Sequence, residues 1–257
     1  MKKKIILIMG LPGSGKTTIA KKIVKFLKAE WLNADKVRGK YKDWDFSDAG
    51  IIRQVRRMRD LATRSNNKYV VADFVCPMDY QIKIFKPNFI FWMDTIKKSR
   101  FDSMNKKFKK PKKYNLRITT QNSDLWKYLI LDKIQKYKWK NKAPTSQMLG
   151  RFQPWHKGHR TLFENIFKKN GQVNIQVKDV NGIGDNPFKF NEIKKTILAD
   201  LKDFKNRILI TKVPNIVEIN YGRTVGYKIR KINLSKKIQS ISATKIRKVL
   251  RKKKVIK

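Results

Sequence analysis

Short apolar runs alternate with helically spaced apolar residues along the first half of the chain. The run at 4–9 predicts a buried strand, and the spacing of Ile19, Ile23 and Leu27 predicts a helix directly after it. The same two patterns return further along the chain. They predict strands at 69–72 and 89–93, and helices around 51–62 and 124–137.

The second half starts the alternation again. We expect strands at 147–152, 173–177 and 207–213, and helices at 159–169, at 192–202 and from Ala243. Strands that alternate with helices are typical of parallel sheets covered by helices. The pattern therefore predicts an α/β protein with two domains, 1–139 and 147–257, each a parallel sheet flanked by helices. The polar segment 140–146, which contains a proline, is the expected linker.

Composition agrees with a folded protein. The 257 residues are 40% hydrophobic and include 14 Phe and 6 Trp. The apolar run after the basic N-terminus is too short for a signal peptide, and no stretch approaches the roughly 18 apolar residues of a membrane span. Cys76 is the one cysteine, so no internal disulfide can form. These features lead us to expect a cytoplasmic protein without a membrane segment.

The charge is extreme, because 63 Lys plus Arg against 19 Asp plus Glu give +44. One interpretation is attraction to nucleic acid or to highly phosphorylated ligands. The other is a compositional bias, since Lys greatly outnumbers Arg and the charge is spread along the whole chain. We favour the second interpretation, so a nucleic-acid partner is possible but not favoured. The sequence leaves the oligomeric state open.

The sequence GLPGSGKT at 10–17 is a complete phosphate-binding P-loop between a predicted strand and a predicted helix. Its glycines let backbone N–H groups surround phosphate oxygens, and Lys16 would reach the β- and γ-phosphates of ATP. The Thr17 hydroxyl is a candidate Mg²⁺ ligand. The expected ATP-binding residues here are Gly10, Gly13, Ser14, Gly15, Lys16, Thr17 and Thr18.

Several segments after this loop resemble adenylylsulfate (APS) kinases over roughly the first 95 residues. LNADKVR at 32–38 is similar to that family's L-D-G-D-N-x-R, DFS at 45–47 to its G-F-S, VRR at 55–57 to its N-V-R-R, and FVCP at 74–77 to its F-I-S-P. The resemblance implies a kinase of the P-loop fold.

By position, the resemblance makes Asp35 the group that accepts the substrate hydroxyl proton or holds Mg²⁺, directly or through water. It also makes Arg38, Arg56 and Phe74 candidate substrate contacts. A helix N-cap is the alternative for Asp35, and Asp73 is a second acidic candidate for Mg²⁺. The family's D-R-E-E-N is GIIRQ at 50–54 here, so the acceptor is left open.

The stretch GRFQPWHKGH at 150–159 resembles the G-R-F-Q-P-x-H-x-G-H signature of nicotinamide-mononucleotide adenylyltransferases and related cytidylyltransferase-like enzymes. Both histidines of the chain, His156 and His159, lie in it, and at a helix start both can face one triphosphate. The resemblance implies a Rossmann-like nucleotidyltransferase fold. It suggests nucleotide contacts from Gly150, Arg151, Phe152, His156, Gly158 and His159.

A second segment near the C-terminus accompanies this motif. ISATKIR at 241–247 resembles the family's I-S-x-T-x-[IV]-R, which assigns Ser242, Thr244 and Arg247 to the phosphates. Asn186, in an N-P-F segment, favours ATP over CTP by resemblance, and Arg223 is a candidate anion contact in a Gly- and Tyr-rich loop.

The sequence thus predicts a bifunctional, ATP- and Mg²⁺-dependent enzyme. Its partners would be nucleoside triphosphates and small metabolites that carry a hydroxyl or a phosphate. A nucleic-acid-processing protein, either a 5′-OH polynucleotide kinase or a tRNA-binding protein, is the alternative. The choice between ATP and CTP in the second half stays open.

Overall fold

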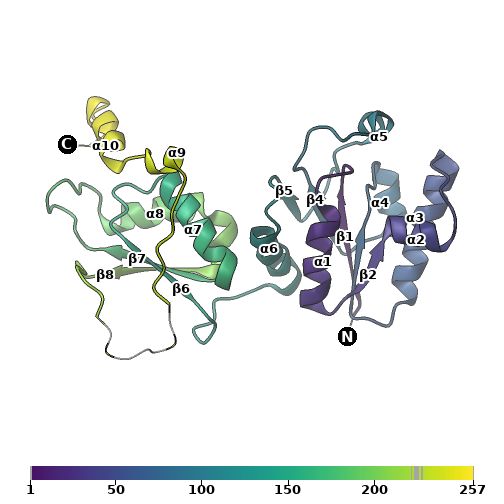
Figure 1. Cartoon of the computed structure of the whole chain (residues 1–257), viewed down its shortest axis with the longest axis horizontal. Helices are drawn as coiled ribbons and strands as arrows, with labels where there is room; N and C mark the ends of the chain where they lie inside the picture. The colour runs from purple at the N-terminus through teal and green to yellow at the C-terminus, as the bar shows by residue number, and fades with distance from the viewer. Residues whose placement is uncertain (1, 221, 223–225, 227, 257) are drawn as a thin grey trace. The chain divides into compact units, whose positions relative to one another are not determined.

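A computed structural model describes every residue except 1, 221, 223–225, 227 and 257 (Figure 1). The chain divides into two compact units, residues 1–136 and 137–257. Each unit is an independent α/β arrangement and is described by itself. Within the described residues, no helix is both long and apolar enough to cross a bilayer.

The first unit is built on a five-stranded, fully parallel sheet. Its strands are β1 (Lys4–Gly10), β2 (Glu30–Asn33), β3 (Tyr69–Asp73), β4 (Phe89–Met93) and β5 (Leu116–Ile118). They lie in the order β2-β3-β1-β4-β5. The chain therefore winds outward in both directions from β1, and the carboxyl ends of all five strands meet at one edge of the sheet.

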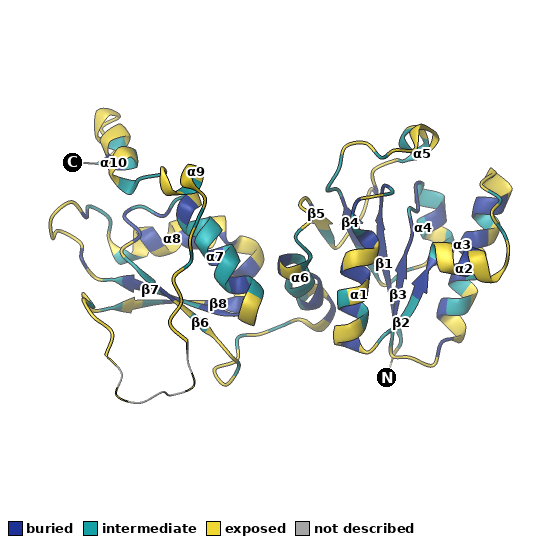
Figure 2. Cartoon of the chain, viewed as in Figure 1, coloured by how far each residue is buried: buried dark blue, intermediate teal, exposed yellow. Residues whose placement is uncertain are grey.

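Helices cover both faces of this sheet, and the alternation along β1 explains how. Ile5 and Leu7 of β1 belong to a core cluster with residues of α2, α3 and α4, whereas Ile6 and Ile8 belong to a second cluster with residues of α1 and α6. Figure 2 shows β1, β3 and β4 largely dark blue, with helices on either side of the sheet. The helices are α1 (Lys16–Leu27), α2 (Ala34–Lys40), α3 (Asp48–Arg64), α4 (Asp79–Phe85), α5 (Asp102–Lys107) and α6 (Ser123–Gln135).

The second unit has a three-stranded parallel sheet in the order β6-β7-β8. Phe163, Phe167 and Phe204 pack with ring centroids 4.9–5.5 Å apart in its core. The elements are β6 (Ser146–Gly150), α7 (Lys157–Asn170), β7 (Val173–Lys178), α8 (Phe190–Asp200), a 3₁₀ turn (Lys202–Arg207), β8 (Ile208–Val213), α9 (Lys236–Gln239) and α10 (Ala243–Lys252).

The prediction of α/β architecture with parallel sheets is confirmed, and every expected strand and helix has a counterpart. Some boundaries differ. The strand expected at 147–152 ends at Gly150, because Phe152 has a positive φ of 52°. The expected linker 140–146 makes contacts inside the second unit: the buried Gln172 side chain donates to the Lys140 carbonyl (2.9 Å) and to the Thr145 hydroxyl (2.7 Å). The identity of the second unit as a nucleotidyltransferase fold stays a prediction.

Candidate functional site

The P-loop residues lie at the carboxyl edge of the first sheet, between β1 and α1. Gly10, Gly13 and Gly15 all have positive φ, and a Cβ on Gly10 would approach the Met93 carbonyl oxygen to 2.4 Å. Two side chains hold the outer side of the loop: the Thr95 hydroxyl donates to the Ser14 carbonyl at 2.7 Å, and the Gln121 amide donates to the Gly13 carbonyl at 3.0 Å. The positive φ angles favour glycine at all three positions, and the Met93 carbonyl leaves no room for a Cβ at position 10.

The start of α1 is suited to an anion. Its N-cap, Gly15, offers no side-chain hydrogen bond, and the first turn holds no acidic residue. The first N–H groups of a helix have no partner within the helix, and they carry the positive end of its dipole. The Ser14 hydroxyl is also buried and has no hydrogen-bond partner among the described residues. A phosphate group would satisfy the backbone N–H groups at this helix start.

Lys16 is folded back over the loop. Its ammonium donates to the Leu11 carbonyl at 2.8 Å and is largely buried. Burial lowers the pKa of Lys16 to about 8, against the opposing attraction of Asp73 and Asp35. A cation that is held close to two carboxylates and has few protein partners is well placed to move onto a phosphate.

Asp73, at the end of β3, is the best-connected acid of the site. Its carboxylate accepts hydrogen bonds from the Thr17 hydroxyl (2.7 Å), the Trp31 indole (2.6 Å) and the Asn33 amide (3.0 Å). Asn33 and Asp73 are paired across β2 and β3, which explains how residues 40 positions apart meet. Burial raises the pKa of Asp73, while the three donors and Lys16 oppose this rise.

This arrangement fits Mg²⁺ bound together with nucleotide phosphates. Mg²⁺ takes oxygen ligands and is usually held in such sites by one or two carboxylates, a hydroxyl and phosphate oxygens. The Thr17 hydroxyl and the Asp73 carboxylate are adjacent, and Asp35 lines the same cavity. Among the described residues there is no cluster of three or more His, Cys, Asp or Glu, so the protein groups alone do not form a complete metal cage.

A cavity of about 1190 Å³ extends from the P-loop past Asp73 to the region of α2 and α3. Asp35, Arg38 and Phe74, three of the residues that the APS kinase resemblance suggests, all line it. Asp35 is the second residue of α2, while Asn33 is the N-cap of that helix and accepts from the Lys36 N–H. The cap alternative for Asp35 therefore goes to Asn33.

Arg38 and Arg56 differ in their placement. The Arg38 guanidinium is buried, donates to the Asp43 and Asp45 carbonyls at 3.0 Å each, and lies 4.6 Å from the Phe46 ring centroid. Arg56 is not among the residues that line the cavity and instead borders a separate hollow. The reason is helical periodicity: Val55 and Met58 face the core, so the side chain of Arg56 points away from it.

The segment between β4 and α6 contributes to the cavity wall as well. Five of its residues line the cavity: Lys98, Ser99, Arg100, Phe101 and Lys107. Phe101 is the N-cap of α5, and Lys107 is the last residue of that helix. Lys107 also pairs with Asp48 at 3.2 Å.

In the second unit, the two histidines lie against each other at the start of α7. Their ring centroids are 3.8 Å apart, the His156 N–H donates to Nδ1 of His159, and His156 Nδ1 accepts from the Gly158 N–H. Burial lowers the pKa of His156, and burial together with the His156 charge lowers the pKa of His159 to about 4. Both rings are therefore neutral at pH 7, and because Nδ1 of each accepts, each Nε2 carries the proton.

Gly158 permits this packing, since a Cβ there would lie 2.9 Å from Cε1 of His156. A Cβ on Gly150 would similarly come within 2.8 Å of the Phe152 ring, and that ring packs edge-on against His159. Arg151, by contrast, is exposed. The motif at 150–159 thus forms one packed cluster at the carboxyl end of β6.

Arg247 connects the C-terminal helix to this cluster. It is buried, donates to the Gln153 carbonyl and to the Thr244 hydroxyl (3.3 Å), and pairs with Asp185 at 2.7 Å. Gln153 in turn exchanges two 2.9 Å hydrogen bonds with the backbone of Phe188. The two sequence segments that the resemblance pairs, 150–159 and 241–247, are therefore in direct contact.

Three further residues that the resemblance or the loop composition suggested in the second unit are Asn186, Ser242 and Arg223. Asn186 is buried and donates to the Ile183 carbonyl at 2.6 Å, which shapes the loop before α8. Ser242 is the N-cap of α10 without a side-chain cap bond. Arg223 lies outside the described residues.

Sequence reasoning missed Trp31, Asn33, Gln153 and Asp185. No local pattern singles out Trp31 or Asp185, because the partner of each is more than 40 positions away in the sequence. Gln153 was part of a recognised motif but had no assigned contact. Asn33 carried a signal, since it follows a strand and precedes a helix as caps do.

A comparison with known protein families gives a match within the first unit. The family model for an AAA domain matches residues 5–77, from β1 to the loop after β3. Together with the P-loop geometry, this match supports a P-loop nucleotide-binding domain in the first unit. No curated protein matches the chain significantly.

Solved structures similar to the chain include three kinases. The APS kinase CysC of Mycobacterium tuberculosis in complex with AMPPNP and APS shares 20% identity over 52% of this chain and 98% of its own, with a TM-score of 0.45. Shikimate kinase from Acinetobacter baumannii in complex with shikimate shares 18% over 54% and 96%, with a TM-score of 0.42. A gluconokinase from Sinorhizobium meliloti 1021 shares 11% over 45% and 81%, with a TM-score of 0.35.

Proposed function

We propose that the first unit transfers the γ-phosphoryl group of ATP to a hydroxyl group of a small metabolite, as the APS kinase resemblance suggests. The observation that carries this proposal is the hydrogen bond between Thr17 and Asp73 beside Lys16, in a cavity that continues to Asp35. A P-loop followed by space for a second ligand and a carboxylate favours phosphoryl transfer over simple nucleotide binding.

Each residue has a role in this reaction. The loop N–H groups and Lys16 bind the β- and γ-phosphates, and Asp35 accepts the proton of the acceptor hydroxyl. The hydroxyl oxygen bonds to the γ-phosphorus, the bond from that phosphorus to the β-phosphate oxygen breaks, and ADP leaves. Mg²⁺ bound to Thr17 and to Asp73 or Asp35, directly or through water, would neutralise phosphate charge. Arg38 and Phe74 would contact the acceptor.

We further propose that the second unit is a nucleotidyltransferase, with ATP favoured over CTP. The acceptor's phosphate oxygen would attack the α-phosphorus, the bond from that phosphorus to the β-phosphate oxygen would break, and pyrophosphate would leave. Two neutral histidines at the start of α7 support this proposal, because they can donate hydrogen bonds to a departing pyrophosphate, and Arg247 of α10 holds the C-terminal segment against the histidine motif.

The test is a metabolite screen with ATP and Mg²⁺ in which ADP and pyrophosphate are measured separately. We expect Lys16→Ala to abolish ADP formation and to leave pyrophosphate formation intact, and His159→Ala to do the reverse. Lys25→Ala, an exposed lysine on the same helix as Lys16, is the matched control. Release of ADP alone in the wild type would overturn the transferase proposal, and release of pyrophosphate alone would overturn the kinase proposal.

A further inference from the structure

The outer face of α3 carries an unusual concentration of arginine. The chain has fifteen arginines among its 63 basic residues, yet all five basic residues of the 17-residue helix α3 are arginine. A compositional bias toward lysine explains the charge elsewhere, but it does not explain a helix that contains no lysine. Arginine differs from lysine in its planar fork, which binds phosphate through two parallel hydrogen bonds.

Four of these arginines line a hollow of about 690 Å³, which we call the arginine groove. They are Arg53, Arg56, Arg57 and Arg64. Tyr41 also lines the groove, and Asp60 is the one carboxylate residue in its lining. The residues 53, 56, 57, 60 and 64 follow helical spacing and lie along one face of α3. At about 1.5 Å per residue, the row from Arg53 to Arg64 is roughly 16 Å long. None of the lining residues of the groove lines the P-loop cavity.

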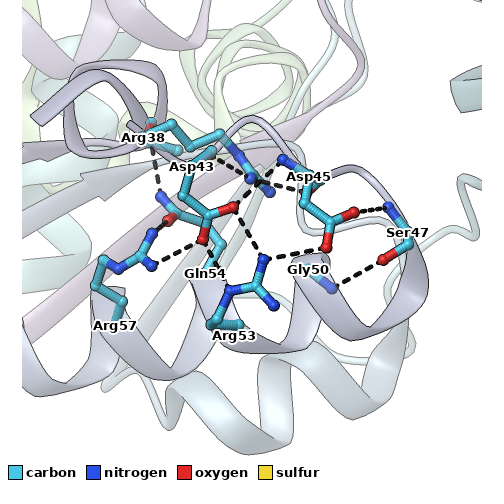
Figure 3. A network of polar contacts seen from close by, with 9 residues as sticks. Arg38, Asp43, Asp45, Ser47, Gly50, Arg53, Gln54 and Arg57 are labelled. Carbon is cyan, nitrogen blue, oxygen red and sulfur yellow. Dashed lines mark hydrogen bonds and ion pairs between the residues drawn. The ribbon is translucent and has the colours of Figure 1, made fainter. Parts of the chain in front are cut away.

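Ion pairs with Asp43 and Asp45 hold two of the arginines in place. Asp43 accepts from Arg53 at 2.9 Å and from Arg57 at 2.8 Å, and Asp45 accepts from Arg53 at 3.0 Å (Figure 3). These guanidinium groups hold the pKa of Asp43 well below its usual range. Two carboxylates thus orient the guanidinium groups of Arg53 and Arg57.

An aromatic ring accompanies the charge. The Arg57 guanidinium lies 4.4 Å from the ring centroid of Tyr41, which is 46% exposed. Arg56 and Arg64 are exposed, and their guanidinium groups make no hydrogen bond or ion pair with any residue that the structure describes. The groove therefore combines oriented guanidinium groups, unpaired guanidinium groups and an accessible aromatic ring.

We propose that the arginine groove binds the backbone of single-stranded nucleic acid. A row about 16 Å long exceeds a single phosphate or a small anion and suits a chain of phosphates. Basic grooves that follow the backbone, with aromatic rings available to bases, are the usual means of binding single strands without sequence preference. The proposal does not depend on either catalytic activity.

The test measures binding of a fluorescently labelled, mixed-sequence single-stranded oligonucleotide to the full chain by anisotropy, as RNA and as DNA, over a series of salt concentrations. The variant is Arg56→Gln with Arg64→Gln. The control is Lys25→Gln with Lys133→Gln, exposed lysines on α1 and α6 that cover the other face of the sheet. Both double variants have the same net charge, so the control accounts for general attraction.

We expect the arginine variant to bind more weakly for all sequences and to lower the slope of log affinity against log salt by about 1.4, or about 0.7 for each lost phosphate contact. The control should stay close to wild type. Arg56→Lys with Arg64→Lys should recover most of the slope but not all of the affinity, because charge remains and the fork is lost. Equal slopes in the arginine variant and the control would overturn the proposal. The proposal would also be overturned if the arginine variant lost binding to an acidic peptide and bound the oligonucleotide as wild type does. That result would indicate a protein partner.

Discussion

The protonation state of His159 gives the most direct test of the second unit. Its pKa falls from 6.5 to about 4, because the ring is buried against Phe152, Trp155 and His156. In the unfolded chain the same ring titrates near 6.5. The folded state therefore binds this proton less tightly than the unfolded state does.

The sign and size of the effect follow from this difference. A histidine with a lowered pKa leaves stability at its full value above pH 6.5, and stability falls as the pH drops from 6.5 toward 4. Each pKa unit corresponds to 1.36 kcal/mol, so the loss at pH 4 is about 3 kcal/mol. His159→Asn should remove most of this acid sensitivity, since asparagine does not titrate.

Nuclear magnetic resonance can measure this pKa, because the chain holds only two histidines. We expect one ring to titrate near pH 4, and His156→Gln should assign it to His159. Hydrogen exchange of β7 amides, central in the second sheet, would report the stability of that unit as a function of pH. If the His159 ring titrated at pH 6.5 or above, the burial argument would be refuted. The proposal that two neutral histidine rings donate hydrogen bonds at neutral pH would then fail as well.

Three further predictions concern packing and hydrogen bonds. Trp31→Phe removes one donor to Asp73, so we expect weaker Mg²⁺-dependent nucleotide binding by calorimetry, whereas Trp126→Phe, which loses an indole bond to Thr120, should bind as wild type does. Equal affinities in the two variants would contradict this. Gly10→Ala should cost more than 2 kcal/mol in urea unfolding, because its Cβ would meet the Met93 carbonyl, and Gly13→Ala about 1–2 kcal/mol, because its Cβ has room and only its φ of 83° is strained. Equal losses would exclude the close contact as the cause. Arg247→Met should destabilise the second unit by about 1–3 kcal/mol, because it leaves the buried Gln153 carbonyl unpaired, whereas Arg251→Met, which loses a more exposed pair with the same Asp185, should cost less than about 1 kcal/mol. Urea unfolding with a second-unit probe would decide, and a larger loss for Arg251→Met would count against the assignment.

Periodicity in the sequence predicted the elements that build the two cores. The strand at β1 and the helix at α1 are long, continuous and bounded by a loop of known geometry, so local pattern was sufficient. The elements β2, α2, α4, α5 and β5 are only three to seven residues long. Over such lengths, apolar spacing does not separate a strand from a helix or a loop.

The candidate site shows the same limit in a different form. Motif order indicated that Lys16 and Thr17 would lie between a strand and a helix, and that the histidines would open a helix. The structure makes Lys16 the first residue of α1 and His156 the N-cap of α7, and Asp35 lies two residues after β2. The central place of Asp73 depends on pairing between β2 and β3, which is a property of sheet order and not of local sequence. Arg56 illustrates the reverse case. It stood in a motif, but the helical spacing of Val55 and Met58 already indicated that it faces away from the core.

The two side chains that hold the P-loop have a consequence for how nucleotide would bind. Thr95 donates to the Ser14 carbonyl and Gln121 to the Gly13 carbonyl, so protein side chains restrain the loop backbone at both residues. A loop that is restrained in this way loses less conformational entropy when a ligand binds, so more of the free energy of each new hydrogen bond appears as affinity. Binding of the phosphates would then require little rearrangement of the loop backbone.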